Sequence, residues 1–348
     1  MFDASMRRHL RPRNTLWPTG KMKLGTTSNY VCMALPICIA LLVLTVVYYN
    51  IPGQKSRWNA LRPKSAGQVL KTHNVTGATN KWREKFGYLK PKDHYVVPNI
   101  AHFIWFSCHP FKFEHLISML SAHRVMKAEK IYFYTDCEPS GEWWAEAKEL
   151  IPTLHVESRS RPTKVFNKIL NPKWPQHSAD VARLQILMER GGVYLDTDVF
   201  VVAPLEPLRY YDYVVGRPES KVLNNGVIIA SKHSQFLKIY YKSYEKYNSK
   251  CWACSSVRNQ HTIAMKHKHL LHIEPHSMVN PPYTEWKKLF LNNYNWKVGH
   301  FTIHVWFRTF RNNVPEASDF NPDNIRNLDT AFGEMCRYMY YGSPDIFE

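Results

Sequence analysis

The stretch GGVYLDTD, at residues 191–198, decides the fold and the chemistry of this chain. If residues 195–198 continue a strand, side-chain alternation places Asp196 and Asp198 on one face. Two carboxylates on one face can hold a hard divalent cation, which prefers oxygen ligands. The apolar run at 199–202 indicates burial, and buried carboxylates are costly unless a cation or hydrogen-bond donors compensate them. The sequence therefore predicts a metal site at the end of a buried strand.

A helix is predicted directly before this stretch, at 178–190. Ser178 is its expected N-cap, and Gly191-Gly192 should end it. Asp180 and Arg183 are three positions apart, so they share a face of the helix. The apolar stripe of the same helix consists of Val181, Leu184, Leu187 and Met188.

Strands and helices alternate over most of the chain from residue 98 onward. Strands are predicted at 101–106, 130–135, 213–216, 226–231 and 301–306, and helices at 113–125, 142–150 and 235–247. Such alternation implies parallel pairing, and it predicts the α/β class.

Composition allows one large domain or two small ones, because the chain has 348 residues and is 45% hydrophobic. The net charge of +18 is compatible with nucleic acid, an anionic membrane surface or anionic substrates as partners, or with basic residues spread over the surface. The sequence carries no helix-turn-helix, zinc-finger or RNP signature, which argues against nucleic acid.

A membrane anchor is predicted near the N-terminus. Residues 30–49 carry no charge over a length that spans a bilayer core as a helix. A cleaved signal peptide is disfavoured, because the basic region 1–29 is long and no A-x-A-like site follows the apolar run. We expect a cytosolic tail at 1–29, a signal anchor at 30–49, a stem at 50–97 and a lumenal catalytic domain at 98–348. The Asn74 sequon would then be lumenal.

Seven cysteines are present. Cys108 and Cys137 each follow a predicted strand, so the sequence allows a disulfide between them without settling the connectivity. Cys251 and Cys254 have CxxC spacing, but no second CxxC accompanies them, which argues against a structural zinc site.

The order of these features resembles a known family. An S-x-D-x-x-R helix, a Gly-Gly turn, VYLDTD and then Asn224-Asn225-Gly226 follow one another as in the glycosyltransferases with a DXD sugar-binding region. That family includes α-1,4-galactosyltransferases and the yeast initiating α-1,6-mannosyltransferase, and the glucosylating domains of clostridial toxins are distant relatives. The similarity spans about residues 98–310 and includes AHFIW at 101–105 and IHVW at 303–306. PPYTEWKKLF at 281–290 resembles the galactosyltransferase branch, whereas SVRNQ at 256–260 departs from it, which leaves the acceptor open.

The resemblance implies a GT-A type fold, a Rossmann-like mixed sheet flanked by helices. It also implies Mn²⁺ or Mg²⁺ as cofactor, a UDP-sugar as donor, a glycan or glycolipid as acceptor, retention of anomeric configuration and residence in the Golgi membrane. Two alternatives remain open at this stage. One is a GDP-mannose-dependent mannosyltransferase, and the other is an inactive, membrane-tethered glycan-binding protein.

Five residues receive metal-binding or sugar-binding roles from the resemblance. Asp198 would ligate the metal directly, and Asp196 would contact the metal or the ribose. His304 would complete the metal shell, although a lone strand histidine is also a common structural residue. Asp180 would accept hydrogen bonds from sugar hydroxyls and Arg183 would supply positive charge, although the two could equally form a surface helix pair.

Four further residues are candidates for contacts with the donor or acceptor, and three of them have a second interpretation. Trp105 resembles a uracil-stacking aromatic or is a core tryptophan. Tyr194 contacts the base or ribose or simply packs. Trp306 would close over the donor phosphates through its indole N–H. Asn225 would face the anomeric carbon or acceptor, or it marks an Asn-Gly turn.

Overall fold

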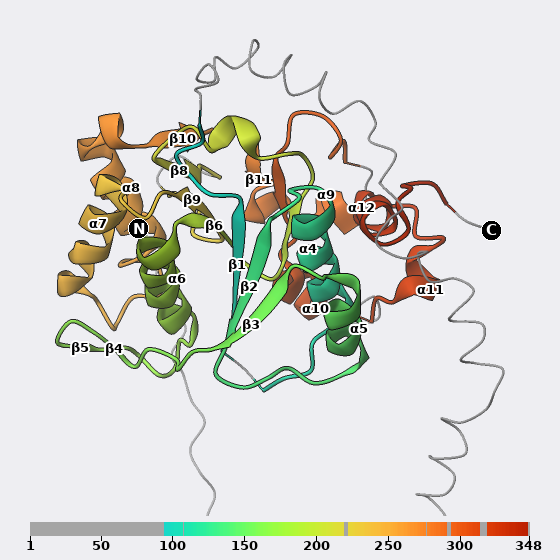
Figure 1. Ribbon diagram of the computed structural model, residues 1–348, viewed down its shortest axis with the longest axis horizontal. Coiled ribbons are helices and arrows are strands. Elements are labelled where there is room, and N and C mark those ends of the chain that lie inside the picture. Colours follow the sequence, from blue (N-terminus) through green and yellow to red (C-terminus); the bar gives the residue numbers. More distant parts are fainter. Residues whose placement is uncertain are drawn as a thin grey trace, which may run out of the picture. The chain divides into compact units, whose positions relative to one another are not determined.

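The computed structural model describes residues 94–106, 108–218, 222–275, 277–290, 294–313 and 319–346 (Figure 1). The predicted tail at 1–29, the anchor at 30–49 and the Asn74 sequon lie outside the described residues, as does most of the predicted stem. Among the described residues, none of the helices has the length and hydrophobicity needed to cross a membrane.

A seven-stranded mixed sheet forms the centre of the domain, in the order β10-β8-β9-β6-β1-β2-β3 (Figure 1). The strands are β1 Ile100–Trp105, β2 Lys130–Thr135, β3 Leu154–Ser158, β6 Gly192–Leu195, β8 Tyr213–Gly216, β9 Val227–Ala230 and β10 His272–Glu274. Strands β3, β2, β1 and β6 are parallel neighbours, while β9 is antiparallel to β6 and β8. This arrangement confirms the predicted α/β class with a mixed sheet.

A second, three-stranded sheet lies beside the first. It consists of β11 Met278–Asn280, β12 Thr302–His304 and β7 Val199–Val201, in the order β11-β12-β7. A small hairpin, β4 Lys164–Val165 and β5 Lys168–Ile169, stands apart from both sheets.

Helices flank the central sheet, as predicted (Figure 1). They are α4 Phe113–Arg124, α5 Glu142–Leu150, α6 Gln176–Arg190, α7 Gln235–Lys242, α8 Val257–Lys266, α9 Lys287–Phe290, α10 Phe307–Asn313, α11 Pro322–Ile325 and α12 Ala331–Tyr341. Alternation along the strands separates two cores. Phe103 and Phe133 belong to the core that includes α4 and α12, whereas Ile104 and Tyr134 belong to the core that includes α6 and α7. A sheet buried on both faces explains the apolar strands.

Three predicted elements differ from the structure by more than one residue at an end. Helix α6 begins at Gln176 behind Pro175, and the hydroxyl of Ser178 donates to the Pro162 carbonyl at 2.7 Å instead of capping the helix. The helix expected at 235–247 ends at Lys242 and continues as a 3₁₀ turn. The strand expected at 301–306 is shorter, because only Thr302–His304 pairs with β7.

The aspartate pair lies on a turn and not on a strand, so the predicted alternation was wrong. Strand β6 ends at Leu195, and the Val199 N–H donates to the Asp196 carbonyl at 3.0 Å to close a turn. The physical reason is that β6 and β7 belong to different sheets, so the chain must change direction between them. Asp and Thr are residues that turns favour.

Two disulfides close loops of the domain. Cys108 and Cys137 are bonded, with Cα atoms 5.3 Å apart, and they join the loops that follow the paired strands β1 and β2. This pairing was one that the sequence allowed. Cys251 and Cys254 form a second disulfide, which explains the CxxC spacing without a metal.

His102 ties β1 to the Gly-Gly turn that ends α6. Its ring is fully buried, its Nε2–H donates to the Gly191 carbonyl at 2.7 Å, and its Nδ1 accepts from the Tyr134 hydroxyl at 3.2 Å. A Cβ at Gly192 would lie 2.8 Å from His102 Nε2, and the φ of +112° at this position favours glycine. Burial lowers the pKa of His102 to about 4.

We expect His102 to make the folded state less stable as the pH falls from about 6.5 to about 4. In that range the unfolded chain binds a proton that the folded chain excludes, so protons favour unfolding. At pH 5 the loss is about 2 kcal/mol relative to pH 7. His102→Gln keeps a donor for the Gly191 carbonyl and removes the titration, so its urea-unfolding free energy should vary less between pH 7 and pH 5.

His155→Gln, at an exposed position, is the control and should follow the wild-type curve. Identical pH curves for His102→Gln and wild type would contradict the assignment.

Candidate active site

Two strands of the smaller sheet bring the predicted metal ligands together. Asp196 and Asp198 occupy the turn between β6 and β7, and His304 ends β12. Strand β12 is antiparallel to β7, so His304 lies opposite Val199. The Val305 N–H also donates to the Asp198 carbonyl at 2.9 Å, which fixes the turn against the end of β12.

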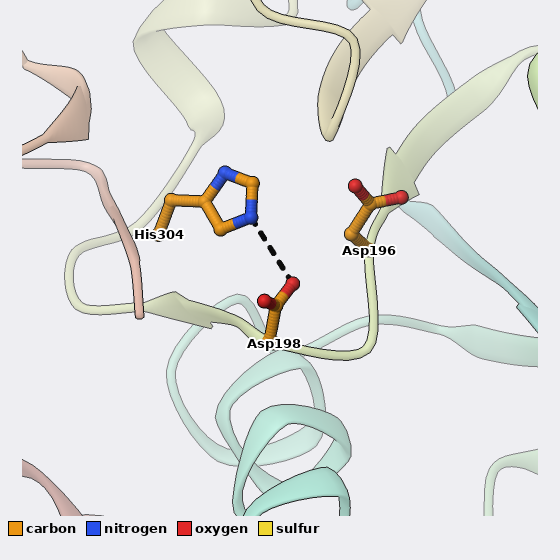
Figure 2. Close-up of side chains that lie close together, drawn as sticks. All are labelled: Asp196, Asp198 and His304. Atoms are coloured by element: carbon orange, nitrogen blue, oxygen red, sulfur yellow. Dashed lines mark ion pairs between the residues drawn. The ribbon is translucent and has the colours of Figure 1, made fainter. Parts of the chain in front are cut away.

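Figure 2 shows the side chains of Asp196, Asp198 and His304 close together, with the ion pair between His304 and Asp198 dashed. Each offers a ligand atom, and these atoms lie within 4.8 Å of one another. His304 Nε2 is 3.1 Å from Asp198 Oδ1. Burial opposes the charged form of both groups, but their attraction is stronger. The pKa of His304 is therefore raised and the pKa of Asp198 is lowered.

Asn224 and Gly226 shape the other side of this cluster. Asn224 Oδ1 accepts from the N–H groups of Gly226, at 2.5 Å, and Val227, at 2.9 Å. The amide NH₂ of Asn224 consequently faces His304 Nδ1, at 3.5 Å. A Cβ at Gly226 would lie 2.7 Å from Asp196 Oδ2, so glycine leaves room for that carboxylate.

Arg183 lies behind the cluster, between two carboxylates. Its guanidinium is 3.3 Å from Asp180 Oδ1 and 3.5 Å from Asp196 Oδ1, and it also donates to the Asn225 carbonyl. Burial opposes its charge, but Tyr194, Asp196 and Asp180 outweigh burial, so the pKa of Arg183 is raised. The charge of Arg183 is thus a fixed part of the site.

Asn225 and two tyrosines complete the hydrogen bonds of this network. Asn225 Nδ2 donates to Asp180 Oδ1 at 2.7 Å, and the Tyr240 hydroxyl donates to Asn225 Oδ1 at 3.2 Å. The Tyr194 hydroxyl donates to Asp196 Oδ1 at 2.6 Å. Asn225 therefore uses both ends of its amide inside the network.

The structure separates the two interpretations of the Asp180–Arg183 pair. Asp180 is 8% exposed and Arg183 is 5% exposed. The pair is therefore buried, and its interpretation as a pair on the helix surface was wrong. The sequence could place the two on one helix face, but it could not show which face is covered.

The structure gives Trp105 and Trp306, the two tryptophans predicted to contact the donor, different surroundings. Trp105 is half-buried against Phe111 and His115, with ring centroids 5.4 and 4.8 Å away, which is the packing arrangement. Trp306 stacks on His304 with centroids 3.7 Å apart, at a φ of +59°. Its indole N–H, which was expected to bind the donor phosphates, donates to the Pro281 carbonyl at 3.2 Å in this structure.

Sequence reasoning missed His115, Asn224 and Tyr240. Burial lowers the pKa of His115 to about 4, against the opposing charge of nearby Asp198. His115 lies within an apolar helix, and Tyr240 lies on another helix, where no local pattern separates a site residue from a packing residue. Asn224 had a signal, because it precedes the Asn-Gly pair that the sequence singled out.

Replacing Arg183 tests the buried charge network. Arg183→Met leaves Asp180 and Asp196 without their buried partner, so we expect a loss of about 3–5 kcal/mol in the free energy of urea unfolding. Adding Asp180→Asn should recover part of that loss. Arg159→Met is the matched control, since Arg159 pairs with the largely exposed Glu189, and it should cost about 1 kcal/mol or less. Equal losses for the two arginine variants would contradict the network.

Comparisons with known proteins agree with this geometry. Residues 104–215 match the family model described as "Glycosyltransferase sugar-binding region containing DXD motif". The chain is 29% identical over 237 residues to glucan organizing enzyme 1 of Cryptococcus neoformans var. grubii serotype A (strain H99), covering 64% of this chain and 62% of that protein. It is 30% identical over 88 residues to the α-1,4-N-acetylglucosaminyltransferase of Homo sapiens, which covers 25% of each.

The chain thus spans less than two thirds of either relative. Among solved structures, the galactosyltransferase LgtC in complex with donor and acceptor sugar analogs superposes with a TM-score of 0.39 and 13% identity, over 72% of this chain and 98% of that one. By the family model, residues 104–215 are therefore similar to the sugar-binding region of glycosyltransferases that contains a DXD motif.

Proposed function

We propose that this protein is a retaining, metal-dependent glycosyltransferase that moves a hexose from a UDP-sugar to a glycan or glycolipid acceptor. The observation that carries the proposal is the convergence of Asp196, Asp198 and His304 within a DXD sugar-binding region. Galactose and N-acetylhexosamine are the proposed sugars. The similarity to a protein named α-1,4-N-acetylglucosaminyltransferase supports the second of these.

The three candidate ligands, Asp196, Asp198 and His304, suit a divalent cation of moderate hardness. Two carboxylates and one imidazole suit Mn²⁺, and Mg²⁺ less closely because of the nitrogen ligand. We propose Asp198 and His304 as direct ligands, with Asp196 on the metal or the ribose. A bound cation would neutralise the diphosphate leaving group.

Arg183 and Asp180 are proposed to act on the sugar side of the cation. Arg183 holds the Asp196 carboxylate in place and keeps a positive charge close to the departing diphosphate. The contacts recorded for Asp180 among the described residues use Oδ1, which leaves Oδ2 for a sugar hydroxyl. Asn225 is proposed to orient Asp180, since its own amide is engaged at both ends.

For the chemical step we propose front-face displacement. The acceptor hydroxyl would attack the anomeric carbon on the side from which the diphosphate leaves, and its proton would pass to an oxygen of the departing diphosphate, so the configuration is retained. No side chain is assigned as a covalent nucleophile, so positioning and fixed charge supply the acceleration.

We also propose a single-pass type II orientation in the Golgi membrane, with the catalytic domain in the lumen. The predicted apolar segment at 30–49 would be the anchor. Two disulfides in the domain support an oxidising compartment, because cytosolic proteins seldom keep such bonds.

A donor screen tests the proposed activity. The full-length protein is treated with a chelator, and release of UDP or GDP from UDP-galactose, UDP-N-acetylhexosamines and GDP-mannose is measured with and without added Mn²⁺. We expect Mn²⁺-dependent release of UDP, and intact-mass spectra without a glycosylated enzyme. Release of GDP alone would indicate a mannosyltransferase, and no release from any donor would indicate a glycan-binding protein.

Asp198→Asn tests the metal role directly. The substitution removes one ligand charge, so we expect turnover to fall by about 100-fold or more, because the cation supplies several kcal/mol to the transition state. The thermal unfolding curve should stay close to that of the wild type. Asp136→Asn, at a carboxylate paired with Arg161, is the control and should keep its activity. Substantial turnover by Asp198→Asn would rule out the proposed ligand.

A further inference from the structure

Tyr283 lies exposed in the short segment that follows strand β11. It begins the 3₁₀ turn Tyr283–Glu285 and is 51% exposed. Its hydroxyl forms no hydrogen bond with the residues that the structure describes. A single exposed tyrosine is ordinary on a protein surface, so its neighbours decide whether it has a role.

Two ring contacts connect Tyr283 with the proposed metal ligand His304. The Trp306 ring stacks on His304, with centroids 3.7 Å apart and 14° between the planes. The Tyr283 ring meets Trp306 edge to face, with centroids 5.4 Å apart and 87° between the planes. The three rings therefore form a continuous aromatic cluster that runs from buried His304 to exposed Tyr283.

The backbone places this aromatic cluster before any ligand binds. Strands β11 and β12 are parallel and Asn280 lies opposite Ile303, so the chain leaves β11 level with His304. The Trp306 indole N–H then donates to the Pro281 carbonyl at 3.2 Å, which joins the two segments beyond the ends of their strands. The segment that carries Tyr283 is thus tied to the candidate metal ligands.

Non-glycine residues at positive φ occur on both strands beside the aromatic cluster. Val279 has a φ of +77°, at the irregularity in register between Met278 and Asn280, and Trp306 has a φ of +59°. Such conformations cost free energy and are found where the surrounding structure requires them, often at binding sites. Both strands thus depart from regular geometry where they carry the cluster.

The Tyr283 segment approaches the metal ligands from the side away from strand β1. In the central sheet, β8 and β1 stand on opposite sides of β6. A Cβ at Gly216, the last residue of β8, would lie 2.7 Å from the Met278 carbonyl oxygen, so β11 begins beside β8. In open α/β sheets, nucleotides bind beyond the carboxyl ends of the parallel strands, which here include β1 and β6. The expected nucleotide and Tyr283 therefore lie on different sides of the metal ligands.

We propose that Tyr283, held against Trp306, is the platform on which a neutral pyranose ring of the acceptor glycan stacks, an inference that rests on the proposed glycosyltransferase function. The C–H groups on one face of a pyranose carry partial positive charge, so they are attracted to the negative face of an aromatic ring. Stacking in this way leaves the hydroxyls at the edge of the sugar free, and one of them can reach the anomeric carbon of the donor.

Two other occupants fit Tyr283 less well. An anionic group would need an unpaired cation beside the ring, but Glu285 and Lys288 of the same segment pair with each other at 2.5 Å, and Lys287 lies over the Trp286 ring. A uracil base would stack on the ring, but it would have to lie on the side of the metal ligands away from β1. A neutral sugar fits both the charge and the position.

Ligand-observed NMR of the full-length protein in detergent micelles tests this platform without turnover. Saturation transfer to methyl β-galactopyranoside, methyl β-glucopyranoside and methyl N-acetyl-β-glucosaminide is titrated in the presence of UDP and Mg²⁺. We expect at least one glycoside to receive saturation, chiefly at its ring C–H groups. Tyr283→Ser should raise the apparent dissociation constant of that glycoside by about fivefold or more, the factor expected for one lost aromatic contact, whereas Tyr283→Phe should stay within about twofold of the wild type. Saturation of UDP should be the same in all three proteins.

Tyr95→Ser is the matched control, because Tyr95 is another exposed tyrosine that packs against one aromatic ring, that of Tyr210, and it should bind the glycosides as the wild type does. Equal glycoside affinity of Tyr283→Ser and wild type would overturn the proposal, as would the absence of saturation transfer from the wild type to all three glycosides. Loss of UDP binding in Tyr283→Ser with glycoside binding intact would also overturn it, by assigning the ring to the nucleotide. Glycoside binding that depends on Tyr283, in a protein that releases no nucleotide in the donor screen, would contradict the proposed function alone.

Discussion

Charge compensation among three neighbouring carboxylates is the constraint on which this site depends. Asp180, Asp196 and Asp198 lie in a largely buried region, where unpaired anions would strongly destabilise the fold. Arg183 lies between the first two, and His304 pairs with the third. Arg183 and His304 hold the carboxylates in position in the absence of any ligand, so a bound metal would meet an arrangement that already exists.

The passage of the chain from one sheet to another creates the site. Strand β6 belongs to the central sheet, whereas β7 pairs with β12 in the smaller one. The turn between them carries both aspartates, and the pairing of β7 with β12 brings His304 to the same place. The Asp196 N–H donates to the Gly226 carbonyl at 2.7 Å, so the residue that precedes β9 also holds this turn. Four strands, β6, β7, β9 and β12, therefore determine where the carboxylates point.

Helix α6 connects the candidate site with the loop of the Cys251–Cys254 disulfide and with the central sheet. Its first turn braces the Trp252 loop through His177, and its next turn carries Asp180 and Arg183. Its end is fixed to β1 by the hydrogen bond from His102 to the Gly191 carbonyl. One helix thus positions Asp180 and Arg183 relative to both the Trp252 loop and the central sheet.

The sequence by itself determined the α/β class, most of the strands and helices, and the aspartates, arginine and histidine of the candidate site. The class, the elements and the aspartate pair follow from short-range patterns: apolar periodicity, glycine at a turn, and acidic residues beside a buried strand. The roles expected for Asp180, Arg183 and His304 came from the family resemblance. Only the tertiary structure decided that the aspartates lie on a turn, that the Asp180–Arg183 pair is buried, and that Asn225 and the Trp306 indole are engaged. It alone brought His115, Asn224 and Tyr240 to the site. The physical reason is that burial and hydrogen-bond partners depend on strands and helices distant in sequence, and a local pattern carries no record of which segments meet.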